Sequence, residues 1–316
     1  MTETKPPLVI IGGATGVGKS ELAVSLAREV GGEIISADSM QVYKGFDIGT
    51  AKIAREQMQE IPHHLIDILN ADGEFNIYEF QRRAKEATQE IYRRGNIPIV
   101  VGGTGFYIHA LLYDTVFENE TEDKSFRKEM EELVKRKGSE HLHSLLIEAD
   151  PQAAASIHPN NVKRVIRALE FRHNSGIRIS RHNTQQKERP SPFNYAYFVL
   201  NRQRMTVYSR IDSRVDKMFQ SGLVGEVAGL LENGVGTESR AMQGLGYKEI
   251  LPLLNGEITL EEAAYRIKLG TRHFAKRQLT WFRREKDVIW MNYEDYENTR
   301  DMLAHMINIL KEKNIV

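Results

Sequence analysis

The residues best suited to chemistry stand near the N-terminus, in the stretch GATGVGKSELAVSLA (Gly13 to Ala27). The stretch fits the pattern G-x-x-x-x-G-K-[ST] and follows a short apolar run, LVII. Glycines let backbone N–H groups gather around one anion, and a following helix adds its positive N-terminal end. Lys19 supplies a mobile positive charge, and Ser20 supplies a hydroxyl that can bind Mg²⁺. The sequence therefore predicts a phosphate-binding loop between a strand and a helix.

The acid that nucleotide-hydrolysing P-loop enzymes use is missing from its usual place. Such enzymes carry a carboxylate at the end of a later strand, but the candidate strand IPIVV ends in Gly102-Gly103-Thr104. A carboxylate instead follows the second strand, where Asp38 opens the stretch DSMQVYKGFDIGTAK. Because the carboxyl ends of parallel strands share one rim of a sheet, Asp38 and Thr104 should lie beside the phosphate loop. This arrangement suits a transferase in which Asp38 takes a proton from the acceptor.

These residues also have structural interpretations. Aspartate after a strand is often a turn or helix N-cap residue, and spacing alone does not decide between that role and catalysis for Asp38. For Thr104, spacing favours a hydroxyl that stabilises a tight Gly-Gly-Thr-Gly turn. His63 and His64 could bind a transition metal, but no third soft ligand is spaced to join them. A structural role is therefore favoured for the histidine pair.

Two stretches are basic, although the whole chain balances 43 Lys and Arg against 43 Asp and Glu. They run from Lys163 to Arg189 and from Arg266 to Lys286. In the second stretch, aromatic residues stand among the basic ones: Phe274, Trp281 and Phe282. Cations that neutralise phosphates and aromatic rings on which bases stack are typical of RNA-binding proteins. One such stretch alone would usually be a solvated helix face, but two favour a polyanionic partner.

The elements that must position these residues alternate between strand and helix in the first third of the chain. Short apolar strands separated by helices indicate a doubly wound parallel sheet. From residue 115 to residue 192 amphipathic helices follow one another without strands. The strand YAYFVL then returns the chain to the sheet, and only helices are predicted after it. The expected fold is α/β: a P-loop NTPase-like parallel sheet flanked by helices (1–114 and 193–316) with an all-helical insertion domain (115–192).

Composition narrows the setting of the protein. The chain has no cysteine, which excludes disulfides and thiolate zinc sites and suits a reducing compartment. Its first residues, MTETKPP, lack the layout of a signal peptide. The longest apolar candidate, IPIVVGGTGFYIHALLY, is too short and too polar to span a membrane. We therefore expect a cytoplasmic protein without membrane contact, and we expect a monomer.

Several motifs follow one another along almost the whole chain: GATGVGKS, ADSMQVYKGFDIGTAK, HHLIDI, VGGTGFYI, DPQAAASIHPNNVKRVIRALE, QGLGYKE and AKRQLTWFRR. Together they closely resemble the bacterial tRNA dimethylallyltransferases, or isopentenyltransferases, of the IPP transferase family. The resemblance implies transfer of a dimethylallyl group from dimethylallyl diphosphate to N6 of the adenosine 3′ of the anticodon. The tRNAs would read codons beginning with U, diphosphate would be released, and Mg²⁺ would be required. The implied partner is the anticodon stem-loop, and the helical insertion would help to bind it.

The resemblance also implies roles for individual residues. Asp38 would be the catalytic base, and Thr104 would position the reacting groups. The residues implied to bind diphosphate are Gly13, Ala14, Thr15, Gly16, Val17, Gly18, Lys19, Ser20 and Arg214, with Ser20 also the Mg²⁺ ligand. Those implied to contact tRNA are Asp38, Ser39, Met40, Gln41, Lys163, Arg164, Val165, Ile166, Arg167, Gln243, Gly244, Leu245, Gly246, Tyr247, Lys248, Lys276, Arg277, Gln278, Leu279, Thr280, Trp281, Phe282 and Arg283. These residues form four stretches: 38–41, 163–167, 243–248 and 276–283. The second and the fourth lie within the two basic stretches described above.

Two other functions stay open on the residues alone. A P-loop kinase of a small metabolite or a polynucleotide would share the phosphate loop and an aspartate on the acceptor side. A non-catalytic RNA-binding protein would keep the basic stretches but would have no need of an intact Lys19, Ser20 and Asp38. Turnover of ATP, compared with turnover of dimethylallyl diphosphate, separates the kinase from the transferase.

Overall fold

The computed structural model describes residues 5–117 and 125–316, with residues 187 and 188 described by their backbone alone. The chain divides into two compact units. One comprises Met1–Leu112 and Pro192–Val316, and the other comprises Tyr113–Ser191. Each unit has its own hydrophobic core.

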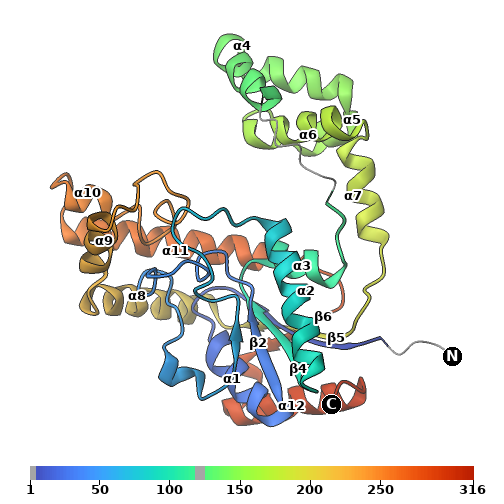
Figure 1. Ribbon diagram of the computed structural model, residues 1–316, viewed down its shortest axis with the longest axis vertical. Helices are drawn as coiled ribbons and strands as arrows, with labels where there is room; N and C mark the ends of the chain where they lie inside the picture. Colours follow the sequence, from blue (N-terminus) through green and yellow to red (C-terminus); the bar gives the residue numbers. More distant parts are fainter. Residues whose placement is uncertain (1–4, 118–124) are drawn as a thin grey trace. The chain divides into compact units, whose positions relative to one another are not determined.

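The first unit is built on a six-stranded sheet in the order β3-β2-β4-β1-β5-β6 (Figure 1). Every strand pair in it is parallel, which confirms the predicted α/β class. Helices cover both faces, so the central strands are apolar on both sides. The strands are β1 (Pro7–Gly13), β2 (Gly32–Ser36), β3 (His63–His64), β4 (Ile97–Gly102), β5 (Asn194–Asn201) and β6 (Val288–Asn292).

Two of these strands were missed by the sequence prediction. The expectation of only helices after β5 was wrong at β6, which pairs with β5 at one edge of the sheet. Of the residues in β6, only Met291 is fully buried, so no run of buried apolar residues announces the strand. At the other edge, β3 has only two residues, too few for any periodicity to be read.

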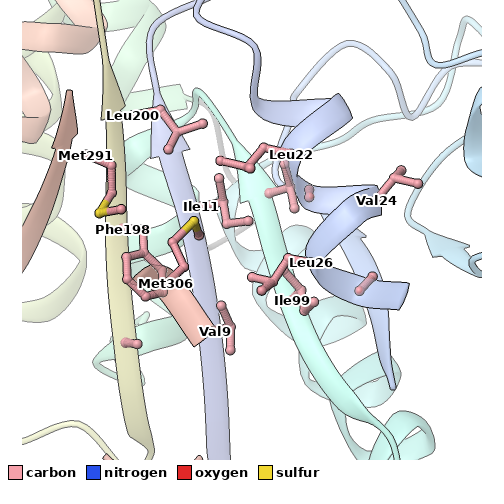
Figure 2. Close-up of a cluster of buried hydrophobic side chains, with 14 of the residues drawn as sticks. Val9, Ile11, Leu22, Val24, Leu26, Ile99, Phe198, Leu200, Met291 and Met306 are labelled. Atoms are coloured by element: carbon pink, nitrogen blue, oxygen red, sulfur yellow. The ribbon is translucent and has the colours of Figure 1, made fainter. Parts of the chain in front are cut away.

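One face of the sheet packs against α1 (Lys19–Val30) and α12 (Thr299–Glu312). Figure 2 shows this core, in which Val9 and Ile11 of β1 lie among side chains from both helices, including Leu22 and Met306. Each fully buried side chain of this size stabilises the fold by about 1.5–3 kcal/mol. The core therefore fixes α1, and with it the loop that leads into α1.

The opposite face carries three helices: α2 (Ile77–Arg93), α3 (Gly105–Leu112) and α11 (Leu260–Phe282). The last of these lies close to β1, because a Cβ added at Gly12 would meet the ring of Phe282 at 2.8 Å. The remaining helices of this unit are α8 (Arg204–Gln220), α9 (Leu223–Glu232) and α10 (Leu251–Leu254), with 3₁₀ turns η1 (Arg55–Met58) and η2 (Tyr293–Asp295).

The described residues of the second unit form helices and no strand. Its helices are α4 (Ser125–Ala149), α5 (Pro151–Ser156), α6 (Val162–Ser175) and α7 (Ile179–Glu188). Non-helical torsion angles at Gly138 (φ 82°, ψ 169°) interrupt α4, where the sequence predicted two successive helices. The buried carboxylate of Asp150 accepts hydrogen bonds from Ala153 N–H at 3.1 Å and from the Ser180 hydroxyl at 2.7 Å. It thereby joins the start of α5 to α7.

No helix within the described ranges is long and apolar enough to cross a membrane.

Candidate active site

The phosphate loop joins β1 to α1 at the carboxyl edge of the sheet. Its glycines Gly16 (φ 82°) and Gly18 (φ 108°) have positive φ angles, which other residues adopt only with strain. A Cβ at Gly13 would lie 2.7 Å from the carbonyl oxygen of Leu200 in β5. Gly18 caps α1 without a side chain, which leaves the first N–H groups of the helix accessible to an anion.

Arginines from outside the loop hold its carbonyl groups. Arg210 of α8 donates from Nε to the carbonyl oxygen of Gly16 at 2.8 Å, and Arg202 donates to that of Val17 at 3.0 Å. The Arg202 guanidinium lies 3.3 Å from the centre of the Tyr293 ring. Because the peptide unit is planar and its N–H points away from its own carbonyl, fixing these carbonyls also fixes the direction of the N–H groups in the same peptide units.

Lys19 lies against its own loop. Its Nζ donates hydrogen bonds to the carbonyl oxygens of Gly13 and Ala14, both at 2.9 Å. Burial is the main cause that lowers the pKa of Lys19 to about 7; the charge of Arg214 contributes in the same direction, and Asp38 opposes both. An anion bound beside Lys19 would therefore favour its charged form strongly.

Asp38 and Thr104 each lie two residues beyond the end of a strand, β2 and β4, and a backbone hydrogen bond links the two segments. Thr104 N–H donates to the carbonyl oxygen of Ala37 at 3.3 Å, which brings the end of β4 to the end of β2. Asp38 Oδ1 accepts the N–H of Met40 at 2.9 Å, so the predicted turn role is real. Among the described residues, its second carboxylate oxygen and the Thr104 hydroxyl accept or donate no hydrogen bond. Both groups are therefore available for a substrate.

One cavity of about 980 Å³ brings most of the predicted site residues together. Its wall combines the phosphate loop, the ends of β2 and β4, and segments of α8 and α11. The predicted residues that line it are Thr15, Gly16, Gly18, Lys19, Ser20, Asp38, Ser39, Met40, Gln41, Thr104, Arg214, Gly244, Leu245, Gly246, Lys248, Arg277 and Gln278. A second cavity, of about 1310 Å³, shares Arg210 and Arg214 with the first. Within the loop, Gly13, Ala14 and Val17 are buried and do not line the cavity.

The implied tRNA contacts divide into exposed and buried side chains, because a helix that packs on a core turns only one face outward. Val165 and Ile166 are buried in the core of the second unit, and Tyr247 and Phe282 are buried in the first. For these four side chains we correct the prediction, since they pack in cores. Those that are exposed are Lys163, Arg164, Gln243, Lys248, Lys276, Arg277, Thr280 and Arg283.

The three aromatic residues of the second basic stretch differ in how far they are exposed. Phe282 is fully buried. Trp281 is partly buried, and a Cβ at Gly105 would lie 2.1 Å from its ring. Phe274 is 36% exposed, lines the cavity, and has the Arg277 guanidinium 5.7 Å from its ring centre. Phe274 is therefore the ring best placed to stack on a base.

Sequence reasoning missed the residues that support the loop. Arg210 lies four residues before Arg214, and this spacing puts both on one helix face, a signal that could have identified it. Nothing local distinguishes Arg202 or Tyr293, since their partners lie 185 and 275 residues away in the sequence.

No group of three or more His, Asp or Glu side chains in the described part of the chain could hold a metal ion. His63 Nδ1 lies 2.7 Å from the carbonyl oxygen of Ile61, and His64 Nε2 lies 2.7 Å from Glu33 Oε2. These contacts support the structural interpretation of the histidine pair. The exposed Ser20 hydroxyl on the cavity wall suits Mg²⁺, which prefers oxygen ligands and takes many of them from phosphate and water.

The chain is similar to a known family over most of its length. The family model described as IPP transferase matches residues 41–285. The tRNA dimethylallyltransferase of Lachnoclostridium phytofermentans is 53% identical over 310 residues, which cover 98% of this chain and 99% of that relative. The tRNA dimethylallyltransferase of Bacillus subtilis is 47% identical over 292 residues, with 92% of each chain covered.

Solved structures of similar transferases also match this chain in fold and sequence. The full-length tRNA isopentenylpyrophosphate transferase of Bacillus halodurans matches with a TM-score of 0.73 and 41% identity, covering 98% of both chains. A eukaryotic dimethylallyltransferase acting on tRNA matches with a TM-score of 0.84 and 31% identity, covering 98% of this chain and 80% of that one.

Proposed function

Since the chain belongs to the IPP transferase family, we propose how its residues carry a dimethylallyl group to tRNA. Its activity is that of a tRNA dimethylallyltransferase, a prenyltransferase. The observation that carries the proposal is a single cavity lined by the phosphate loop, Asp38 and Thr104. The relatives described above are all transferases of this kind, so the kinase alternative receives no support.

The donor, dimethylallyl diphosphate, binds with its diphosphate in the phosphate loop. Loop N–H groups, Lys19 and Arg214 surround the anion. Because the pKa of Lys19 is low without a ligand, binding of the anion shifts this side chain towards its charged form. As the C–O bond of the donor breaks, its electron pair leaves with the diphosphate. Cations and N–H groups that are already oriented stabilise this developing charge.

The acceptor is N6 of the adenosine 3′ of the anticodon, in tRNAs that read codons beginning with U. Its lone pair is delocalised into the ring, so it becomes a good nucleophile only as its proton is removed. The new C–N bond forms between N6 and C1 of the dimethylallyl group, and Asp38 takes the proton, an effect typically worth about 10²–10⁴-fold. The Thr104 hydroxyl, unbonded within the described residues, orients the reacting groups. The base must leave its stack to enter the cavity, which costs a few kcal/mol.

We expect Mg²⁺ to be required. Ser20 is the residue that would hold it, and the ion would supply additional positive charge to the diphosphate.

The anticodon stem-loop binds to the exposed cations. In the first unit these include Lys248 beside the cavity and, on α11, Lys276 and Arg277. In the second unit Lys163 and Arg164 are exposed at the start of α6, which supports a role for the insertion in tRNA binding. Arg167, by contrast, already contacts Glu170 at 3.5 Å, so its charge is partly neutralised.

The test is transfer of label from radiolabelled dimethylallyl diphosphate, with Mg²⁺, to unmodified tRNA that carries adenosine 3′ of its anticodon. Label should enter the tRNA and should be lost when that adenosine is replaced. Label at another nucleotide would contradict the acceptor assignment, and consumption of ATP without transfer would restore the kinase alternative.

A further inference from the structure

We propose that Gln278 of α11 is a positioning residue for the donor site, and not a direct tRNA contact. The proposal rests on the function proposed above, because it concerns how the phosphate loop is held for dimethylallyl diphosphate. It also revises the sequence-based assignment of Gln278, which lies within a stretch implied to bind tRNA.

Gln278 is buried and bonded to the phosphate loop. Gln278 is only 7% exposed, whereas Lys276 and Arg277, which precede it in the sequence, are exposed. Its Oε1 accepts the backbone N–H of Thr15 at 2.8 Å. Among the described residues, no other side chain accepts a hydrogen bond from an N–H of the loop.

The other end of the same amide lies against the turn after β4. A Cβ added at Gly103 would lie 2.0 Å from Gln278 Nε2, and the next nearest atom outside Gln278 would be 3.4 Å away. Gly103 directly precedes Thr104. One buried amide therefore contacts both the loop that binds the diphosphate and the turn that carries Thr104.

Gln278 therefore holds a backbone N–H of the phosphate loop, a contact that its exposed neighbours Lys276 and Arg277 do not make. The loop's carbonyls are fixed by Arg202 and Arg210, but its Thr15 N–H is fixed from α11. Losing that contact leaves a partly buried N–H without its partner and frees the side of the loop that faces Thr104. The consequence falls on the alignment of donor and acceptor, since small displacements of reacting groups cost large factors in rate.

The first experiment compares Gln278→Ala with the wild-type enzyme in the labelled transfer assay. We expect the KM for dimethylallyl diphosphate to rise about tenfold or more, the effect of leaving one such N–H unpaired, and kcat to fall. The dissociation constant of tRNA, measured by filter binding, should stay within about twofold. Lys276→Ala, on the exposed face of the same helix, should give the opposite pattern: weaker tRNA binding with an unchanged KM for the donor.

A double-mutant cycle distinguishes positioning from general destabilisation. Gly103→Ala should impair donor use because its Cβ meets the Gln278 amide, and this harm should largely disappear in the Gly103→Ala, Gln278→Ala double variant. Two effects that simply add would contradict the proposal, as would a Gln278→Ala variant that loses tRNA affinity and keeps its donor KM. Circular dichroism and the melting temperature of each variant establish that it is folded. Failure of the wild-type enzyme to transfer label would instead contradict the proposed function itself.

Discussion

Arg210 and Gly16 are joined by a hydrogen bond of 2.8 Å from the guanidinium Nε to the backbone carbonyl. This bond ties α8 directly to the phosphate loop. One helical turn later, Arg214 lines the cavity that contains the phosphate loop, Asp38 and Thr104, and it contributes to the lowered pKa of Lys19. Helix α8 thus contributes one arginine that holds the loop and another that can meet the anion inside it.

Lys19 should give donor binding a characteristic pH dependence. Burial and Arg214 lower its pKa to about 7, so its neutral form predominates above that pH. A bound diphosphate favours the ammonium and raises this pKa, so binding at about pH 8 should take up a proton. We expect the affinity for dimethylallyl diphosphate to fall by up to about tenfold per pH unit above about pH 7. Calorimetry in buffers of different ionisation enthalpy measures the uptake.

Lys19→Arg is the matched control for that measurement. Its guanidinium stays charged throughout this range, so binding should take up no proton and should change little with pH. Equal proton uptake by the wild-type enzyme and by this variant would show that another group titrates.

Asp38→Asn should separate catalysis from structure. Asparagine keeps an oxygen that can accept the Met40 N–H, which Asp38 accepts at 2.9 Å, so the turn is preserved. Asparagine cannot take the proton from N6, so turnover should fall by about 10²–10⁴-fold. Affinity for tRNA should be almost unchanged. The control is Asp72→Asn, at an exposed position outside the cavity wall, which should leave turnover and tRNA affinity at wild-type values. Equal losses of turnover and affinity in Asp38→Asn would mean that Asp38 binds tRNA and does not catalyse.

The exposed cations of α11 should determine the salt dependence of tRNA binding. Replacing Lys276 or Arg277 by Ala removes one phosphate contact, so the slope of log K against log salt should become shallower by about one. Titrations at several salt concentrations give this slope. Lys311→Ala, an exposed lysine of α12, is the control and should leave it unaltered. A slope that stays the same in the α11 variants would remove this helix face from the tRNA interface.

Phe274 should act through the face of its ring. Stacking on a base is worth about 1–3 kcal/mol, so Phe274→Ala should weaken tRNA binding by a factor of about 5 to 150. Phe274→Trp should retain the affinity, because it keeps an aromatic surface of the same kind. The comparison uses an anticodon stem-loop, which excludes contacts elsewhere in tRNA. If Phe274→Leu binds as well as the wild-type enzyme, the contact is apolar packing and not stacking.

The parts of the site that could be predicted from the sequence are those whose determinants are local. GATGVGKS specifies its own backbone shape, and Asp38 and Thr104 follow strands whose carboxyl ends must meet on one rim. The supports of the loop could not be predicted in this way, because the role of Gln278 depends on Thr15, 263 residues away in the sequence. Only the packing of α11 against the sheet brings the two together.

The same distinction applies to the fold and to the tRNA contacts. Motif matching marks continuous stretches, whereas packing decides residue by residue, so Lys276 is exposed while Phe282, in the same stretch, is buried. The strand β6 was missed because its identity comes from pairing with β5, a contact between segments that are far apart in the chain.

Glu33 should make folding stability depend on acid. It lies at the start of β2 with a nearly fully buried side chain. Arg94 donates to it from Nε and from a terminal nitrogen, both at 2.7 Å, Asn96 donates at 2.8 Å, and His64 Nε2 lies at 2.7 Å. The hydrogen bonds from Arg94 are the main cause that lowers the pKa of Glu33 to about 2, from 4.5.

A carboxylate with a lowered pKa stabilises the fold fully above its unfolded pKa, and this contribution is lost as the pH falls through the folded value. Glu33→Gln should therefore lower the unfolding free energy at neutral pH by about 2–3 kcal/mol, less than for a fully buried pair because Arg94 is half exposed. The difference from wild type should shrink between about pH 4.5 and about pH 2. Urea unfolding of both proteins across this range measures it. A difference that stays constant down to the acid end would mean that Glu33 acts through its packing and not through its charge.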